Sequence, residues 1–537
     1  MKLKPAPLKI ALLVSDIYAN QYIRDLFIRL RNDSGIELTD LIVVNSTKKK
    51  SFMQHSCFFL FRVILVTERL FLFRNKKIVN HIVSHHDISS LFKMNIRLTS
   101  NEVVEAKLDK LAGTDIDLII KLGDEIEKFS NLERFSKVGL ISANFTPEGA
   151  GAARLAGFWE VFYKQNSTIF SVYHILKNGS KVGLLQCLFQ TRYCFLLNKS
   201  FLYKKSGIHF YNFIQEVAKN RHLQVIPKPI ETLSKSKSLY TVSIGVVISY
   251  LFKTWIIVLK KIVRSLQDGV QWHSVIYNKS FNTSLVSEPR IMPNPIKRIL
   301  ADPFLIEHES KTYCFVEDFE YRAKRGKISC FEVYDNKFSD ISVCLEETFH
   351  LSFPFVFKYN NELYMCPETC DSDQIRVYKA VNFPFEWKLE KVIMDNVRAA
   401  DTLLFEKEGK WWMLTNIDPS RIGDNSSELY LFYSNSPLST EWTPHKLNPI
   451  YVDATKARNG GIIIENNTVY RVAQKQEFDK YGASVGIYRI DEITVDTYVE
   501  NFVSTIEANY IPDILGTHHM SGTSHYTALD FYDLRKY

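Results

Sequence analysis

Ala400-Asp401-Thr402-Leu403-Leu404-Phe405 shows a pattern that recurs through the second half of this 537-residue sequence. A small or polar residue precedes an anchor residue, and an apolar strand follows. The same order is found at 301–305, 352–357, 457–462 and 516–520. With anchors at 302, 354, 401, 458 and 518, the intervals are 52, 47, 57 and 60 residues. Each interval has room for four short strands and their turns.

Five recurrences predict five blades. From Trp272 onward the sequence consists of short aromatic and β-branched runs broken by Gly, Asn, Asp and Pro, which is typical of an all-β domain. A second strand with an aromatic residue follows most anchors, at 311–315, 362–365, 410–413 and 468–471. A five-bladed β-propeller over 271–537 fits this pattern. A β-sandwich is the alternative, but it gives no reason for a period of this length.

The innermost strands of a propeller face its central channel, so polar residues far apart in the sequence would meet there. The predicted channel residues are Asp302, Glu317, Glu368, Asp401, Arg458, Gln474 and His518. A protonated carboxyl group beside an ionised one suits chemistry at a glycosidic bond, while Arg and His bind anionic or hydroxyl groups. The alternative interpretation is that Asp302 and Asp401 are structural and accept hydrogen bonds from backbone amides.

The second half also resembles a known domain. Over about 272–537 it looks like the five-bladed domain at the N-terminus of plant glucosamine inositolphosphorylceramide transferases and of many bacterial surface-polysaccharide proteins. The segments that carry the resemblance are Ala301–Leu305, 315–318, 324–329, His350–Phe357, 367–369, Trp442–Pro449, Ala457–Gly461 and Gly516–His518.

That domain is similar to the propeller of arabinanase- and xylosidase-type glycoside hydrolases, whose inverting members place two Asp and one Glu in the channel. The resemblance implies that Asp302 is the general base and that Glu368 and Asp401 take the other two roles. The residues expected to bind substrate are Glu317, Arg458, Gln474 and His518.

The first half reads as an α/β domain over 1–205. Apolar strand-like runs at 9–15, 116–121 and 138–143 alternate with helical and turn segments, which favours a mostly parallel sheet. Over about 9–200 it resembles the Rossmann-type fold of the folate-dependent formyltransferases, through 139–144 (GLISAN) and 179–184 (GSKVGL).

In that resemblance the catalytic Asn, His and Asp of the family fall on Ser142, Asn144 and Lys181. An amide has no proton that titrates near neutrality, and lysine reverses the charge that should orient the histidine. We therefore expect no formyl transfer and no formyl-folate cofactor, and a domain used for binding a nucleotide sugar or glycan.

Residues 206–270 are predicted to be a helical linker. In its apolar segment, 239–259, the only charge is Lys253, and Lys260, Lys261 and Arg264 follow on the same helical face. A helix lying on an anionic membrane surface and a helix packed between domains both remain open. Cys57–Phe73, with five Phe, is a second apolar stretch and is predicted to be a core helix.

Composition narrows the remaining choices. The net charge of +8 comes from scattered Lys and Arg, so no nucleic-acid partner is expected. Of eight cysteines only Cys366 and Cys370 are close in sequence, and no second pair completes a zinc set, so we predict no metal site. Met1–Pro7 leads directly into a strand without an export signal, so we expect a cytoplasmic protein with reduced thiols.

These observations favour an enzyme of bacterial surface-polysaccharide assembly. Glycosyl transfer or hydrolysis would take place in the propeller channel, on a glycan, nucleotide-sugar or lipid-linked sugar, at the inner face of the membrane. A propeller that only binds glycan is the alternative, and an amino-sugar formyltransferase is the third hypothesis.

Overall fold

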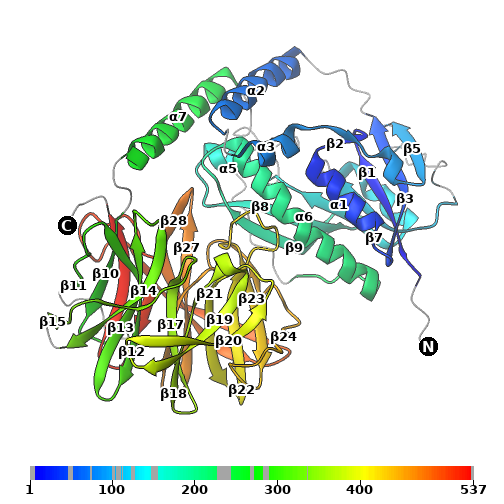
Figure 1. Ribbon diagram of the computed structural model, residues 1–537. Helices are drawn as coiled ribbons and strands as arrows, with labels where there is room; N and C mark the ends of the chain where they lie inside the picture. Colours follow the sequence, from blue (N-terminus) through cyan, green and yellow to red (C-terminus); the bar gives the residue numbers. More distant parts are fainter. Residues whose placement is uncertain are drawn as a thin grey trace. The chain divides into compact units, whose positions relative to one another are not determined.

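The chain forms two compact units, Met1–Lys260 and Lys261–Tyr537, seen in a computed structural model (Figure 1). The structure describes residues 6–45, 52–72, 75–99, 103, 111, 113–122, 127–146, 155–226, 243–266, 271–281, 289–334 and 337–533. Residues 227–242, which hold the predicted Pro-containing and Ser/Lys-rich connection and the first four residues of the predicted apolar segment, lie outside these residues.

The first unit is built on a seven-stranded sheet of order β5-β3-β1-β6-β7-β8-β9. Its strands are β1 Leu8–Val14, β3 Ile36–Asn45, β5 Met94–Thr99, β6 Ile116–Leu122, β7 Ser136–Asn144, β8 Ser167–Ile175 and β9 Lys181–Gln190. The first five in the sheet pair in parallel, while β8 and β9 are antiparallel. The apolar runs of β1 and β6 are buried because parallel strands are covered on both faces.

Helices accompany this sheet. They are α1 Gln21–Arg31, α2 Phe52–Phe71, α3 Lys76–Val83, α5 Phe158–Phe162, α6 Phe195–Asn220 and α7 Ile244–Leu266. The side chain of Asn20 caps α1 by accepting a hydrogen bond from the amide of Ile23 at 3.0 Å. The prediction of an α/β domain is confirmed as a mixed sheet with helices. The finer resemblance to formyltransferases stays a prediction.

The predicted boundary at residue 205 falls inside a helix. Helix α6 runs without interruption through that point, and its C-terminal half buries Phe210, Tyr211, Ile214 and Val217. These side chains recur at helical spacing and pack against the first unit, so residues 206–220 belong to it rather than to a linker. The boundary between the two compact units therefore lies between Lys260 and Lys261.

The second unit contains five sheets, which are the five blades of a propeller. Blade 1 holds β12 Arg298–His308, β13 Lys311–Glu320, β14 Arg325–Tyr334, β15 Lys337–Phe338 and β16 Ser342–Leu345. Blade 2 holds β17 Ser352–Tyr359, β18 Glu362–Glu368, β19 Gln374–Asn382 and β20 Glu386–Asp395. Blade 3 holds β21 Ala399–Lys407, β22 Lys410–Ile417, β23 Glu428–Ser434, β24 Thr443–Pro444 and β25 Tyr451–Val452.

Blade 4 holds β26 Asn459–Glu465, β27 Thr468–Glu477, β28 Lys480–Ile493 and β29 Tyr498–Glu507. Blade 5 joins β10 Gln271–Tyr277 and β11 Arg290–Ile291 to β30 Met520–Gly522 and β31 Thr527–Asp533. Because β10 pairs with β31, the two ends of the unit share one sheet and close the ring. Strands β12, β17, β21, β26 and β30 contact one another in turn around the axis. The prediction of a five-bladed propeller is confirmed.

A β-bulge repeats near the start of the innermost strand in four blades. The register shifts between 301 and 304, 352 and 355, 400 and 403, and 459 and 461. In the first three, Asp302, Phe353 and Asp401 have φ of 50°, 46° and 49°. In the fourth, Gly461 has φ of 132°, and a Cβ there would lie 2.0 Å from the carbonyl oxygen of Met520. The structural repeat is thus this bulge, which turns side chains out of the regular alternation.

Three of the five predicted anchor residues do not occupy the bulge position with positive φ. Asp302 and Asp401 occupy it, but in blade 2 the residue with positive φ is Phe353 rather than Pro354. Arg458 lies just before β26, and His518 lies two residues before β30. The pattern of residue types located each blade correctly, but it could not show which residue adopts the strained backbone conformation.

Candidate functional site

Four acidic side chains come from matching positions in blades 1 to 3. Asp302 and Asp401 stand at the bulges of β12 and β21. Glu317 of β13 pairs with Ala301, and Glu368 of β18 pairs with Ser352, each opposite the residue that precedes a bulge. The two glutamates therefore hold equivalent places in neighbouring blades. Charge interactions between Asp302, Glu317, Glu368 and Asp401 place all four in one site.

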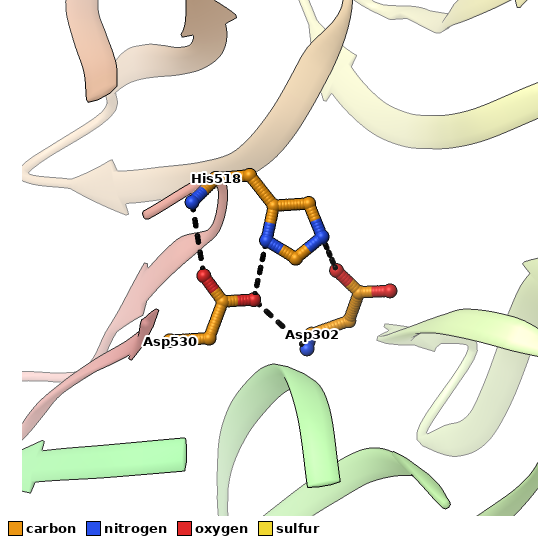
Figure 2. Close-up of side chains that lie close together, drawn as sticks. All are labelled: Asp302, His518 and Asp530. Atoms are coloured by element: carbon orange, nitrogen blue, oxygen red, sulfur yellow. Dashed lines mark hydrogen bonds and ion pairs between the residues drawn. The ribbon is translucent and has the colours of Figure 1, made fainter. Parts of the chain in front are cut away.

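Asp302 belongs to a buried chain of ionisable groups that includes a residue missed by sequence analysis, Asp530 (Figure 2). His518 Nδ1 lies 2.7 Å from Asp530 Oδ2, and His518 Nε2 lies 3.4 Å from Asp302 Oδ1. Asp530 also accepts hydrogen bonds from the backbone amides of Asp302, His518 and His519, at 3.2, 3.0 and 3.0 Å. The imidazole is therefore held between two carboxyl groups that lie 228 residues apart in sequence.

The charges in this chain follow from burial and from neighbours. Burial opposes ionisation of Asp530, but the charge of His518 and the donated hydrogen bonds outweigh it and lower the pKa of Asp530. Burial likewise opposes a charged His518, yet Asp530 and Asp302 raise its pKa. Burial raises the pKa of Asp302 to about 7, against the opposing effect of His518. Near neutrality, Asp302 therefore exchanges its proton while its two partners form an ion pair.

The backbone amide of Phe353 donates a hydrogen bond to the second carboxylate oxygen of Asp302, at 3.2 Å. This contact is the kind that the structural interpretation of Asp302 requires.

His519, adjacent to His518, packs its ring against two phenylalanines. Its ring centroid lies 4.4 Å from that of Phe304 and 5.5 Å from that of Phe353. Burial lowers the pKa of His519 to about 3, so this ring stays neutral.

A second group of predicted residues surrounds Asp401. Arg458 Nε and Gln474 Nε2 donate to Asp401 Oδ2 at 2.7 and 3.1 Å. Arg458 Nη2 lies 3.9 Å from Glu368 Oε2, so the guanidinium bridges the acids of two blades. Gln474 also donates to the carbonyl oxygen of Asn459 at 2.7 Å. Asp401 is thus fixed as a paired carboxylate rather than a group free to move.

The pKa values of both glutamates are raised. Burial raises the pKa of Glu368 well above its ordinary value, and the neighbouring Asp401 adds to the effect, while Arg458 opposes it. Burial and the charges of Asp302 and Glu368 raise the pKa of Glu317 in the same way. His350 Nδ1 accepts from the amide of Gly326 at 2.9 Å, which leaves its Nε2 proton directed at Glu317 Oε1, 3.5 Å away.

Exposure divides the cluster into an outer and an inner layer. The side chains of Glu317 and Glu368 are 15% exposed and that of Arg458 is 16% exposed. Those of Asp302, His518, Asp401 and Asp530 are at most 7% exposed. A ligand that arrives from solvent therefore meets the two glutamic acids and the arginine first.

Aromatic rings adjoin the charged groups, and sequence analysis missed them. The ring centroids of Trp272 and His518 lie 4.0 Å apart, and Tyr481 lies 5.2 Å from the same imidazole. Arg458 sits over the Tyr481 ring at 5.1 Å. Tyr481 is 40% exposed and offers a flat apolar face next to hydrogen-bonding groups. This combination suits binding of a sugar ring.

A sequence signal for Asp530 did exist. It is an acid in the middle of β31, whose other residues up to Phe531 are buried and mostly apolar. Asp302, His518 and Asp530 are also the one set, among the residues that the structure describes, whose ligand-type atoms all lie within 4.8 Å. The carboxylates of Asp530 and Asp302 raise the pKa of His518, which also suits the three groups to relaying a proton.

The three residues that the predicted formyltransferase resemblance singles out, Ser142, Asn144 and Lys181, lie in the first unit. Ser142 and Asn144 are brought together at the end of β7, where the hydroxyl of Ser142 donates to Asn144 Oδ1 at 2.8 Å and both residues are buried. Lys181 begins β9, and its ammonium lies 5.6 Å from the centre of the Tyr173 ring.

Comparison with known proteins finds sequence relatives of the propeller. The family described as "Glucosamine inositolphosphorylceramide transferase 1, N-terminal" matches residues 284–516. The curated proteins named glucosamine inositolphosphorylceramide transferase 1 of Oryza sativa subsp. japonica and Arabidopsis thaliana are 38% and 37% identical to the chain over 207 and 206 residues. Each match covers 37% of this chain, and 27% and 26% of the relatives. The chain thus spans about a quarter of the length of the curated relatives that it matches.

Solved structures show more distant similarity. The catalytic domain of a GH62 α-L-arabinofuranosidase of Coprinopsis cinerea matches 49% of this chain and 98% of its own, at 11% identity and a TM-score of 0.35. A family 117 glycoside hydrolase of Zobellia galactanivorans matches 49% of this chain and 91% of its own, at 12% identity and a TM-score of 0.34. The predicted resemblance to the N-terminal domain of the inositolphosphorylceramide transferases is confirmed by the sequence relatives.

Proposed function

We propose that this protein acts on glycans and transfers a sugar between oxygen atoms at the propeller site. The observation that carries the proposal is the position of Glu368, which reaches solvent beside the Arg458–Asp401 ion pair and whose pKa burial raises. Glycosidic oxygen is a poor leaving group until it is protonated, and a carboxylic acid kept neutral at pH 7 is the donor that this step requires.

In the proposed reaction, Glu368 gives its proton to the leaving oxygen as the bond to the anomeric carbon breaks. Asp302 accepts the proton of the incoming hydroxyl, directly or through one water molecule. Asp401 and Arg458 hold the substrate and balance the charge that develops. Hydrolysis uses the same groups, with a water molecule in place of the acceptor sugar.

The substrate class proposed is a nucleotide sugar or lipid-linked sugar of bacterial surface-polysaccharide assembly. Arg458 would meet a phosphate or acidic sugar, as a guanidinium does well. We further propose that the protein works in the cytoplasm at the inner face of the membrane. Five buried or half-buried cysteines of the propeller, Cys314, Cys330, Cys344, Cys366 and Cys370, carry thiols that form no disulfide bond, which fits a reducing compartment. The proposed chemistry needs no cofactor.

A propeller that binds glycan without turnover is the second candidate. It is favoured by the bonds that Asp401 already makes with Arg458 and Gln474, and by the backbone amide on Asp302. The match also covers only about a quarter of each curated transferase, so transfer in those proteins can depend on parts that this chain does not match.

Two measurements separate these candidates. The full chain is incubated with a panel of UDP-sugars and of methylumbelliferyl and 2,4-dinitrophenyl glycosides, and products are followed by mass spectrometry and fluorescence. Glycan binding is measured on an array with the same preparation. Turnover supports the enzyme, while binding that Tyr481→Ala and Arg458→Met remove, with no turnover of any probe, supports the binding module.

We also propose that the first unit has a formyltransferase-like fold that binds a ligand and does not transfer formyl groups. The protein, supplied with 10-formyltetrahydrofolate and amino-sugar nucleotides, is expected to yield no formylated product above a protein-free control. Mass spectrometry of the products checks this result. Formylation that disappears in the Asn144→Ala variant would show that the expectation is wrong.

The pH dependence of turnover tests the role of the proton chain. Because the base must be ionised, kcat/KM should fall as pH drops through about 7, the pKa of Asp302. His518→Gln removes the positive charge that lowers this pKa, so the acidic limb should move to higher pH. His525→Gln is the matched control, since His525 is 75% exposed and pairs with Glu307 instead. An acidic limb that His518→Gln leaves in place would exclude Asp302 as the base.

A further inference from the structure

Helix α2 and the part of α7 up to Lys260 form a pair within the first unit, away from its sheet (Figure 1). The rings of Phe71 and Trp255 contact each other, with centroids 6.1 Å apart. The buried carboxylate of Glu68 ties the pair together, since it accepts a hydrogen bond from the hydroxyl of Tyr250. It also accepts from the backbone amides of Phe195 and Leu196 at 3.0 and 2.6 Å, where α6 begins. The position of α7 on this unit is therefore specified.

Helix α7 is apolar on two faces. One face, with Val247, Tyr250 and Val258, is buried. The other face consists of large side chains that are 51 to 68% exposed: Ile248, Phe252, Trp255 and Leu259. A helix at the surface of a globular domain ordinarily has one apolar face and a polar face opposite it. The second apolar face therefore lacks the polar residues that water would favour.

Helix α2 also has large apolar side chains that are exposed. Val66 and Leu70 are 61% and 75% exposed on a helix whose opposite side holds the buried Ile64 and Glu68. We call these two residues together with Ile248, Phe252, Trp255 and Leu259 the apolar ridge. Large exposed apolar residues that recur on one face of a helix mark an interaction surface.

The exposed charges that the two helices themselves carry are of one sign. Among the described side chains of the two helices, the exposed ionisable groups are cations: Arg62, Arg69, Lys253, Lys260 and Lys261. The acid Glu68 is fully buried. An exposed tryptophan beside cations is typical of the boundary between water and lipid, and such a surface attracts anionic headgroups.

The predicted cationic face of α7 does not itself form the contact surface. Lys253 lies over the ring of Phe162 at 4.5 Å, and Lys261 pairs with Asp479 at 2.7 Å. The side chain of Arg264 lies outside the described residues. The exposed apolar face, rather than the cationic one, is the feature that needs a partner, and the cations flank it.

We propose that the apolar ridge lies in the headgroup layer of an anionic lipid bilayer, with α2 and α7 parallel to its surface. No helix in the described part of the chain is long and apolar enough to cross a membrane, so the contact is with one leaflet. This inference rests on the proposed position at a membrane and is independent of the chemistry in the propeller.

The test uses the full chain and vesicles of phosphatidylcholine with 30% phosphatidylglycerol, compared with pure phosphatidylcholine. The protein should co-sediment with the anionic vesicles at low salt and detach in part as salt rises, because screening shortens the reach of charge to about 8–10 Å near physiological ionic strength. Phe252→Ser with Trp255→Ser should lower the partition coefficient at least tenfold. Brominated lipid should quench tryptophan fluorescence less in Trp255→Phe than in the parent.

The matched control is Phe385→Ser with Phe502→Ser, which removes two propeller phenylalanines that are 55% and 58% exposed and should leave binding unchanged. Melting temperatures should be unaltered in both double variants, because the replaced side chains are exposed. Glu368→Gln should bind vesicles like the parent, so a failed catalytic proposal would not affect this result.

Absence of vesicle binding, or binding that the ridge variant retains, would overturn the proposal. A parent dimer in solution that the ridge variant converts to monomer, without lipid affinity, would overturn it too and assign the ridge to a second copy of the chain.

Discussion

Glu368→Gln is expected to lower kcat about 10²–10⁴-fold on substrates with a poor leaving group, the contribution that general acid catalysis ordinarily makes. On 2,4-dinitrophenyl glycosides the loss should be much smaller, because dinitrophenolate leaves without a proton. The amide keeps the volume of the acid and loses only the proton. Rates on paired substrates of good and poor leaving group measure the effect.

Two variants serve as comparison. Asp302→Asn should slow both kinds of substrate, since the base acts on the acceptor whatever the leaving group. Glu317→Gln removes the equivalent acid of blade 1 and should raise KM more than it lowers kcat, as expected for a binding residue. A Glu368→Gln variant that loses activity equally on both substrates would show that Glu368 is not the proton donor.

Arg471→Met is expected to destabilise the propeller by about 3–5 kcal/mol, the cost of leaving a buried charge without its partner. Arg471 of β27 and Glu500 of β29 are fully buried, and they form two parallel hydrogen bonds of 2.8 and 2.6 Å. Burial works against the ionised form of Glu500, but Arg471 and Tyr498 lower its pKa. The stability from this pair is therefore present near neutrality and is lost as pH falls through that lowered pKa.

Urea unfolding followed by tryptophan fluorescence measures the loss, because five of the seven tryptophans lie in the propeller. Arg471→Met with Glu500→Leu should recover most of the stability, since it leaves no unpaired charge. Arg489→Met is the matched control, as its pair with Asp491 is on the surface and its removal should give no measurable shift. Equal midpoints for Arg471→Met and the control would contradict the assigned role.

Much of the architecture could be predicted from the sequence because its signals are local. The apolar runs at 9–15 and 116–121 predict buried parallel strands, and β1 and β6 occupy them. The repeated anchors predict five blades, and five sheets are present. The boundary at 205 was wrong because a helix end shows in the sequence only through caps and breakers, whereas α6 is long and continues on tertiary packing.

Seven site residues of the propeller were predicted, and the structure assigns them to different layers. Glu368 and Arg458 reach solvent, whereas Asp302 and Asp401 are buried and bonded. Residue type shows that a carboxyl group is available, but its pKa depends on burial and on charges from other blades. Asp302 meets Asp530 across 228 residues, and no local pattern connects them.

By itself, the sequence determined the strand periodicity and the presence of acidic residues among aromatic ones, since both depend on neighbours within one blade. It also determined the number of blades, because the same pattern recurs five times along the chain. Only the tertiary structure decided which carboxyl group has a raised pKa, because the pKa of Glu368 depends on its burial and on the charges of Asp401 and Arg458 from other parts of the propeller. It also decided which face of α7 is exposed, because both faces are apolar and only packing against α2 and α6 buries one of them.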